Sequence, residues 1–125
     1  MRKKILVADD DPAIVDCLQI MLEDADYDVA ATSSGQTISL AKSFHPNVIL
    51  LDIWMSGQDG RNICKYLKKQ ADTKSIPIIM ISATRDLAES AKNAGAEDFI
   101  AKPFQMDYLL AKVAQYVGGD TNART

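Results

Sequence analysis

Short apolar runs alternate with amphipathic stretches along the 125-residue chain. Apolar runs bounded by polar or turn-forming residues are typical of buried strands. These runs predict five strands, at residues 4–8, 28–32, 48–51, 76–81 and 98–101. The second run is short and weakly apolar, which is typical of an edge strand, and Pro77 fits only near the start of the fourth strand.

The stretches between these runs carry apolar residues at helical spacing. They predict a helix that starts at residues 11–12 and four more helices, at residues 35–44, 62–70, 87–94 and 105–117. In the first helix Asp11 is the expected N-cap and Pro12 takes the first helical position. Ile14, Leu18 and Met21 give that helix an apolar stripe, so we expect it to pack on a sheet.

Strands that alternate with helices imply a parallel sheet covered on both faces, and right-handed crossovers leave few ways to wind it. We predict an α/β fold of the flavodoxin-like type, a (βα)5 three-layer sandwich with a five-stranded parallel sheet in the order 2-1-3-4-5. In this order the chain reverses between the first and third strands. Ligands bind outside the carboxyl ends of the strands at such a point.

Composition fits a single globular domain, with 47% hydrophobic and 25% charged residues. We assign residues 1–118 to this domain and residues 119–125 to a flexible C-terminal tail or the start of a linker. The net charge of −3 argues against direct contact with nucleic acid. No apolar run is long enough for a membrane span or a signal peptide, so we expect a cytoplasmic protein without membrane insertion. Cys17 and Cys64 lack metal-ligand spacing, and we expect reduced thiols.

Polar side chains follow the ends of four predicted strands. They are Asp9 and Asp10 after the first strand, Asp52 after the third, Ser82 after the fourth and Lys102 after the fifth. Like charges at neighbouring strand ends are unfavourable unless a cation lies between them. Carboxylates favour a hard cation, so we expect Mg²⁺, with Mn²⁺ as a possible substitute. A hydroxyl and an ammonium group beside the ion are what phosphoryl transfer requires, and an aspartate is then the expected nucleophile.

Five pieces of the sequence together resemble the receiver domain of two-component response regulators. They are Ile5-Leu6-Val7-Ala8-Asp9-Asp10-Asp11, Val48-Ile49-Leu50-Leu51-Asp52, Gln58-Asp59-Gly60, Ile81-Ser82-Ala83 and Phe99-Ile100-Ala101-Lys102-Pro103-Phe104. Each piece alone is weak, but they run in the family's order over about residues 3 to 117. This combination makes the resemblance specific.

The resemblance implies a role for each polar residue at the strand ends. Asp52 would accept a phosphoryl group from a histidine of a partner kinase or phosphotransfer protein. Mg²⁺ would be held by Asp9, Asp10, Asp52 and the backbone carbonyl of Trp54. In this family the domain is a signalling module and not an enzyme, because it assists only its own phosphorylation and dephosphorylation.

The resemblance also implies how the switch works. Ser82 and Lys102 would bind the phosphoryl group, and Phe99 would change rotamer together with Ser82. The Lys102-Pro103 peptide bond would be cis. The surface of the fourth helix, fifth strand and fifth helix would change, for an unknown downstream effector or a homodimer. Phe99 could equally be a plain core residue.

Two positions depart from the family pattern. Ser56 stands where the family usually has proline, and we expect a looser loop there. Trp54, two residues after Asp52, is unusually bulky and is a candidate shield of the phosphoryl group against water.

Other functions remain open at this point. The alternative is a Mg²⁺-dependent phosphohydrolase with an aspartyl-phosphate intermediate, in which Asp9 would be the nucleophile. A flavin-binding flavodoxin is less favoured, because the carboxylates after the first strand would repel phosphate. A degenerate receiver that only docks partners would not need the intact acids, Ser82 and Lys102. The sequence leaves open whether the chain is a stand-alone receiver or the first part of a longer regulator.

Overall fold

A computed structural model describes residues 2–33, 35–55 and 57–117 of the chain. Its centre is a five-stranded parallel sheet made of β1 (Lys4–Ala8), β2 (Asp28–Thr32), β3 (Val48–Asp52), β6 (Ile78–Ser82) and β7 (Asp98–Ala101). The strand order is β2-β1-β3-β6-β7. The short strands β4 (Trp54–Met55) and β5 (Gln58–Asp59) form a separate hairpin, so this order is the predicted 2-1-3-4-5. The predicted flavodoxin-like fold is confirmed.

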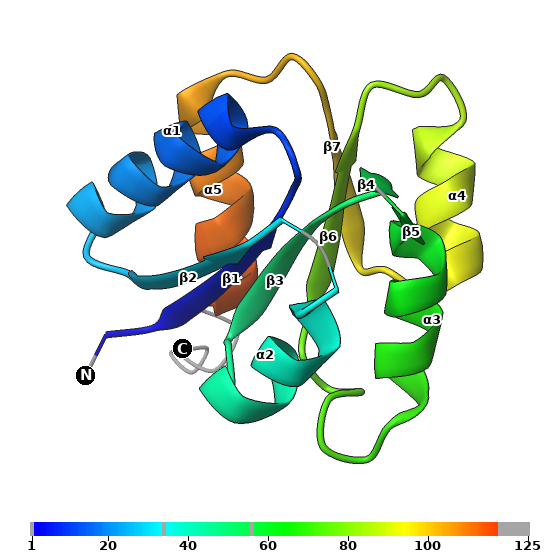
Figure 1. Cartoon of the computed structure of the whole chain (residues 1–125). Helices are drawn as coiled ribbons and strands as arrows, with labels where there is room; N and C mark the ends of the chain where they lie inside the picture. The colour runs from blue at the N-terminus through cyan, green and yellow to red at the C-terminus, as the bar shows by residue number, and fades with distance from the viewer. Residues whose placement is uncertain (1, 34, 56, 118–125) are drawn as a thin grey trace.

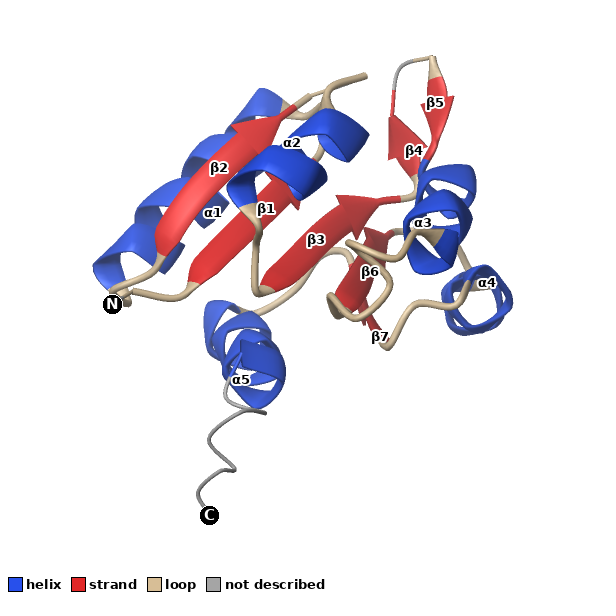
Figure 2. Cartoon of the chain, turned by 90° about the horizontal axis from the view of Figure 1, so that it is seen from below, coloured by secondary structure: helices blue, strands red, loops and turns tan. Residues whose placement is uncertain are grey.

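Five helices cover the two faces of the sheet. They are α1 (Pro12–Asp24), α2 (Thr37–Phe44), α3 (Gly60–Lys69), α4 (Leu87–Ala94) and α5 (Met106–Val117). Helices α1 and α5 lie on one face, and α2, α3 and α4 lie on the other (Figures 1 and 2). None of the helices in the described part of the chain is long and apolar enough to cross a membrane.

The core consists of two apolar clusters, one on each face of the sheet. One cluster joins the sheet to α1 and α5, and the other joins it to α2, α3 and α4. Strands β3 and β6 are buried along their whole length, because both of their faces are covered. Cys17 is exposed on α1 and Cys64 is on the buried face of α3, and both are free thiols, as expected. Burial raises the pKa of the Cys64 thiol to about 11.

Capping residues set the helix ends close to where the sequence predicts them. Asp11 accepts a hydrogen bond from the backbone N–H of Ala13 at 3.0 Å, which confirms it as the N-cap of α1. Gly95 ends α4 with a φ of +87°, a left-handed conformation that favours glycine.

Some predicted helix and strand boundaries are wrong because local contacts in the fold set them. The third helix starts at Gly60, two residues before the prediction, because the Asp59 side chain caps it by accepting from the N–H of Arg61 at 2.9 Å. Strand β6 starts after Pro77, since proline has no N–H for the sheet. Within the predicted loop from 56 to 60, Gln58 and Asp59 instead form β5, which pairs with β4, and Gly60 starts α3; strands this short leave no sequence pattern. Ser56 and the proposed tail at 119–125 lie outside the described residues.

Gly60 ties α3 to the end of β3. Its N–H donates to the carbonyl oxygen of Ile53 at 2.6 Å. A Cβ atom at this position would overlap the backbone carbonyl oxygen of Asp52 and would lie 3.0 Å from the Cα of Ile53. Backbone atoms on both sides leave no room, so this position requires glycine.

We therefore expect Gly60→Ala to lower the free energy of unfolding by about 2–4 kcal/mol, because the end of β3 must shift to admit the methyl group. Urea unfolding followed by circular dichroism measures this change. Gly35→Ala is the matched control. The added Cβ there would meet only the end of the flexible Gln58 side chain, at 3.3 Å, and should change stability by less than about 0.5 kcal/mol. Equal stability of the two variants would contradict this account.

Candidate functional site

Three carboxylates gather at the carboxyl edge of the sheet. Asp9 follows β1 and Asp52 ends β3, and these two strands are hydrogen-bonded neighbours in which Ala8 is level with Leu51. One ligand atom from each of Asp9, Asp10 and Asp52 lies within 4.8 Å of the others. Asp9 and Asp52 are buried, while Asp10 is more exposed. The topology thus brings together acids that are 43 residues apart in sequence.

Lys102, at the end of β7, supplies positive charge to this cluster. Its Nζ lies 2.9 Å from Oδ2 of Asp9 and 3.6 Å from Oδ2 of Asp52. Burial lowers the pKa of Lys102, but the hydrogen bond to Asp9 and the charges of both acids outweigh this effect and raise it. Lys102 is therefore a charged group held in place by the acids. The Lys102-Pro103 peptide bond is cis, as the family resemblance implies.

Asp52 is held in an unfavourable electrostatic environment. Burial and the nearby charge of Asp9 raise its pKa to about 6, although Lys102 and a hydrogen bond from the backbone N–H of Trp54 act in the opposite direction. The ionised form of Asp52 is thus under-compensated by the groups around it.

The donor set fits a hard divalent cation. Carboxylate oxygens are the ligands that Mg²⁺ prefers, and the three side chains are close enough to share one ion. A cation there would also relieve the repulsion between Asp9 and Asp52 that raises the pKa of Asp52.

Ser82 stands at the end of β6, the strand next to β3. In the register of these strands Asp52 is level with Ile81, so Ser82 lies one residue further along. The serine is 2% exposed, and its hydroxyl makes two hydrogen bonds with Thr84. Sequence reasoning predicted the position of Ser82 at the strand ends but missed this partner.

Phe99 lies on β7 and is 38% exposed. It borders a hollow that is lined by residues of α4 such as Ala88, Ala91 and Lys92. The alternative that Phe99 is a plain core residue is therefore wrong for this structure, because a core ring would be covered.

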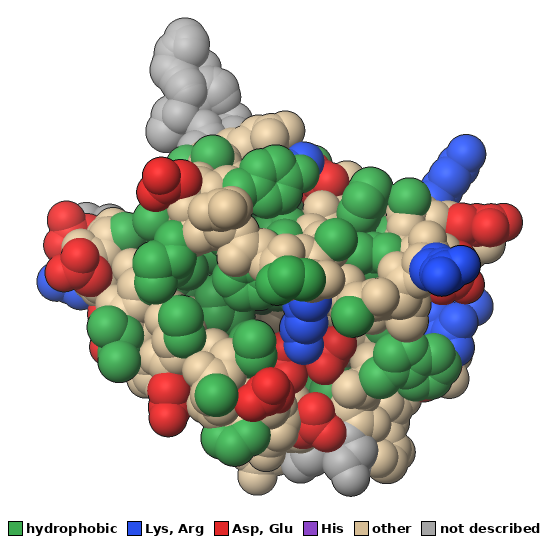
Figure 3. All heavy atoms as spheres, turned by 90° about the horizontal axis from the view of Figure 1, so that it is seen from above, with side chains coloured by type: hydrophobic (Ala, Val, Ile, Leu, Met, Phe, Trp, Pro, Cys, Tyr) green, Lys and Arg blue, Asp and Glu red, His purple; other side chains and the backbone are tan. Residues whose placement is uncertain are grey.

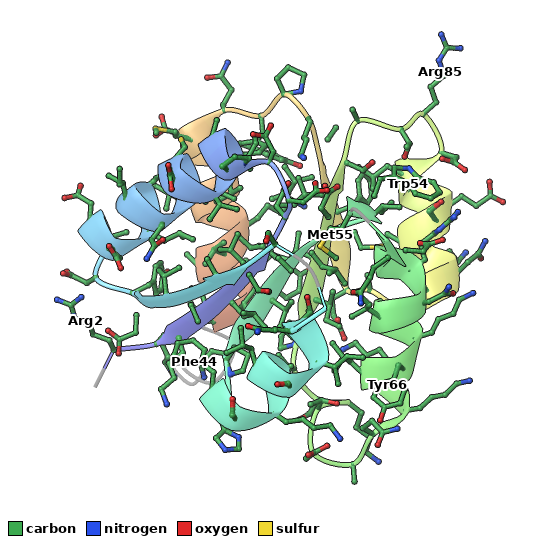
Figure 4. The ribbon with its side chains drawn as sticks, viewed as in Figure 1. Arg2, Phe44, Trp54, Met55, Tyr66 and Arg85 are labelled. Carbon is green, nitrogen blue, oxygen red and sulfur yellow. The ribbon has the colours of Figure 1, made fainter. Side chains whose placement is uncertain are left out.

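Trp54 stacks on Arg61, a contact that sequence reasoning missed. The guanidinium carbon of Arg61 lies 4.6 Å from the centre of the indole ring, which is a cation–π geometry. Asp59 fixes the guanidinium through hydrogen bonds of 2.7 to 3.2 Å, which hold the pKa of Asp59 below its usual range. Trp54 is 53% exposed, whereas its neighbour Met55 is buried, and both belong to β4 at the upper end of the sheet (Figure 4). Asp59 stands two residues before Arg61 at the start of a helix. This spacing of an acid and a base is the sequence signal that could have suggested their pairing.

Apolar surface surrounds the acidic site. Figure 3 shows acidic side chains beside a basic one in the middle of this face, with hydrophobic side chains around them. A hollow lined by Ile14, Cys17, Ala83, Pro103 and Phe104 adjoins Lys102. The charged site thus lies at the surface within an apolar surround.

Comparison with known proteins agrees with the fold and with the acidic site. A family model for the response regulator receiver domain matches residues 5–114. The DNA-binding dual master transcriptional regulator RpaA of Synechocystis is 36% identical over 113 residues, which cover 88% of this chain and 47% of that protein. The DNA-binding response regulator MtrA of Mycolicibacterium smegmatis is 34% identical over 116 residues, which cover 90% of this chain and 50% of that protein. This chain spans about half the length of these curated relatives.

Solved receiver domains have the same fold. The receiver domain of the sensor histidine kinase PA1611 from Pseudomonas aeruginosa, with a magnesium ion in its active site cleft, matches with a TM-score of 0.87 and 26% identity, over 94% of this chain and 99% of that one. The BeF3-activated N-terminal receiver domain of RstA from Klebsiella pneumoniae matches with a TM-score of 0.84 and 26% identity, over 92% and 98%. The chain therefore belongs to the family of response regulator receiver domains.

Proposed function

We propose that this chain is the phosphoacceptor switch of a two-component phosphorelay, and that Asp52 accepts the phosphoryl group. The observation that supports this most is the set of three carboxylates within 4.8 Å, with Lys102 contacting two of them. The phosphodonor is a histidine kinase or a histidine phosphotransfer protein. Asp52 is buried at the carboxyl end of β3 and is 6% exposed, so it is a partly desolvated carboxylate that suits a nucleophile.

In the proposed reaction a carboxylate oxygen of Asp52 attacks the phosphorus of the donor phosphohistidine. The P–N bond breaks, the imidazole nitrogen keeps the electron pair, and an acyl phosphate forms on Asp52. Lys102 starts 3.6 Å from Asp52, so its ammonium group can pair with a phosphoryl oxygen with little movement. The protein's part is positioning and charge compensation, as in other phosphoryl transfers.

Asp9, Asp10, Asp52 and the backbone carbonyl of Trp54 would hold Mg²⁺, and Mn²⁺ is a suitable substitute. When bound, the ion offsets negative charge on the carboxylates and on the phosphoryl oxygens. The PA1611 receiver domain has a magnesium ion coordinated in its active site cleft, which supports this assignment.

The output is a change in the surface formed by α4, β7 and α5. Ser82 moves to the phosphoryl group and Phe99 changes rotamer, and the altered surface binds an effector or a second copy of the chain. Such a domain assists its own phosphorylation and dephosphorylation and is not a general enzyme. The phosphohydrolase alternative is not favoured, because the matching family model is that of receiver domains.

The curated relatives are DNA-binding regulators about twice as long as this chain. By analogy, an effector could lie in further sequence, while residues 1–118 form the receiver. The absence of direct nucleic-acid binding and the cytoplasmic location both stay predictions.

Acetyl phosphate with Mg²⁺ should add one phosphoryl group to the wild-type protein, because Asp52 needs only an activated phosphodonor. Intact-protein mass spectrometry measures this. Asp52→Asn should abolish the added mass, whereas Asp28→Asn, an exposed acid on β2, should keep it. If the wild type gains no mass, the proposed function is wrong. Turnover of p-nitrophenyl phosphate that is lost in Asp9→Asn but not in Asp52→Asn would favour the phosphohydrolase.

The raised pKa of Asp52 predicts a pH-dependent stability. The folded protein binds this proton more tightly than the unfolded chain, so the stability linked to Asp52 is complete below about pH 4 and is lost as the pH rises through about 6. Without metal, Asp52→Asn should therefore be more stable than the wild type at about pH 8. The expected gain is about 1–2 kcal/mol, since solvent at the open site screens part of the effect.

Urea unfolding in the presence of a chelator, at several values between about pH 4 and pH 8, tests this. The stability gain of Asp52→Asn over the wild type should shrink towards acidic pH, and Asp28→Asn, which leaves the three clustered acids intact, is the matched control. A gain that is independent of pH would contradict the electrostatic explanation.

Trp54 is proposed as a shield of the acyl phosphate. Its backbone N–H donates to Asp52, and its exposed ring stacks on Arg61, so the indole is held on the hairpin that directly follows Asp52. Trp54→Ala should speed hydrolysis of the acyl phosphate at least about twofold, since water gains access. The decay of the phosphorylated mass after removal of acetyl phosphate measures the rate. Tyr66→Ala, an exposed aromatic on α3, is the control, and an unchanged decay in Trp54→Ala would contradict the shield.

A further inference from the structure

The hydroxyl of Ser82 is engaged by Thr84 in this structure. Ser82 Oγ donates to Thr84 Oγ1 at 3.3 Å and accepts from the backbone N–H of Thr84 at 3.2 Å. Ser82 is almost completely buried and Thr84 is half-buried, so water competes poorly for these bonds. The two residues form a local turn in which the Ser82 hydroxyl bonds both the side chain and the backbone N–H of Thr84.

A serine hydroxyl carries a single proton. In this arrangement Ser82 Oγ donates to Thr84 Oγ1, so its proton can serve another acceptor only when this hydrogen bond breaks. A phosphoryl group on Asp52 offers strong acceptor oxygens, but Ser82 can donate to them only after it has released the Thr84 hydroxyl. The two acceptors therefore compete for one proton.

We propose that Thr84 is a positioning residue that holds Ser82 in the released state and so sets how readily the phosphorylated state forms. This inference rests on the proposed function of Asp52. Thr84 does not contact the reacting atoms in this account, and it acts only through Ser82. Loss of its hydroxyl should favour the state in which Ser82 binds the phosphoryl group.

The position of Thr84 also connects this exchange to α4. Thr84 lies in the short segment between the end of β6 and the start of α4 at Leu87. The N-cap residue of α4, Asp86, makes no side-chain capping hydrogen bond, so the first turn of this helix is weakly fixed. When Ser82 turns away, the N–H of Thr84 also loses its partner, and the segment before α4 is free to rearrange.

The test is a titration with beryllofluoride and Mg²⁺, followed by the fluorescence of Trp54, the single tryptophan of the chain. Beryllofluoride is a mimic of the phosphoryl group on aspartate. Thr84→Val keeps the shape and the backbone N–H but removes the acceptor oxygen. We expect it to bind beryllofluoride about two- to fivefold more tightly than the wild type, the effect of one long neutral hydrogen bond. Thr84→Ser restores the hydroxyl and should return the affinity to the wild-type value.

The Ser82→Ala background separates this role from a general structural effect. Without the Ser82 hydroxyl, Thr84→Val should no longer change the affinity, because the two residues act through one bond. Thermal unfolding of each variant verifies that it is folded. Equal or weaker binding by Thr84→Val, or the same gain in both backgrounds, would overturn the inference.

Failure of the proposed function looks different. In that case neither the wild type nor any variant binds beryllofluoride, acetyl phosphate adds no mass, and the role of Thr84 falls with it. Binding by the wild type with no effect of Thr84→Val rejects the role of Thr84 alone.

Discussion

The carboxylates at the carboxyl edge of the sheet are the constraint on which the rest of this structure depends. Asp9, Asp10 and Asp52 lie within 4.8 Å of one another, and Lys102 contributes one positive charge to them. Two negative charges then remain, which equals the charge of one divalent ion. Burial and then the charge of Asp9 raise the pKa of Asp52 to about 6, so the protein alone compensates the ionised form of this carboxylate poorly. A site with this excess of negative charge attracts cations. Once a cation is bound, the site can accept an anionic group, as phosphoryl transfer requires.

Such repulsion persists only on a rigid base. Strands β1 and β3 carry the acids, and their apolar residues are buried against helices on both faces of the sheet. Gly60 adds a close backbone contact at the end of β3, which helps to fix the backbone at Asp52. The apolar core thus provides the stability that offsets the unfavourable charges, and the site uses part of that stability for chemistry.

The sequence was sufficient for the fold and for the acids, because both depend on regular patterns. Apolar runs gave the strands, and the topology then placed Asp9, Asp10 and Asp52 at one edge. The hydrogen bonds of Ser82 with Thr84 and the stacking of Trp54 on Arg61 were not predicted. These contacts depend on side-chain rotamers and on a hairpin of very short strands, and neither leaves a periodic pattern. The exposure of Phe99 likewise depends on how closely α4 packs beside β7.

The contrast between a tightly packed core and adjustable side-chain contacts explains where a switch can be built. A change in the packed core would cost several kcal/mol, because cores tolerate little change in volume. An exchange of hydrogen-bond acceptors by Ser82 costs far less, since one bond replaces another. A phosphoryl group then needs only a modest preference for one state to shift the populations. In the proposed switch the elements that respond are the loosely fixed ones, the segment around Thr84, the weakly capped α4 and the exposed ring of Phe99 on β7, while the buried strand β3 that carries Asp52 is the rigid support.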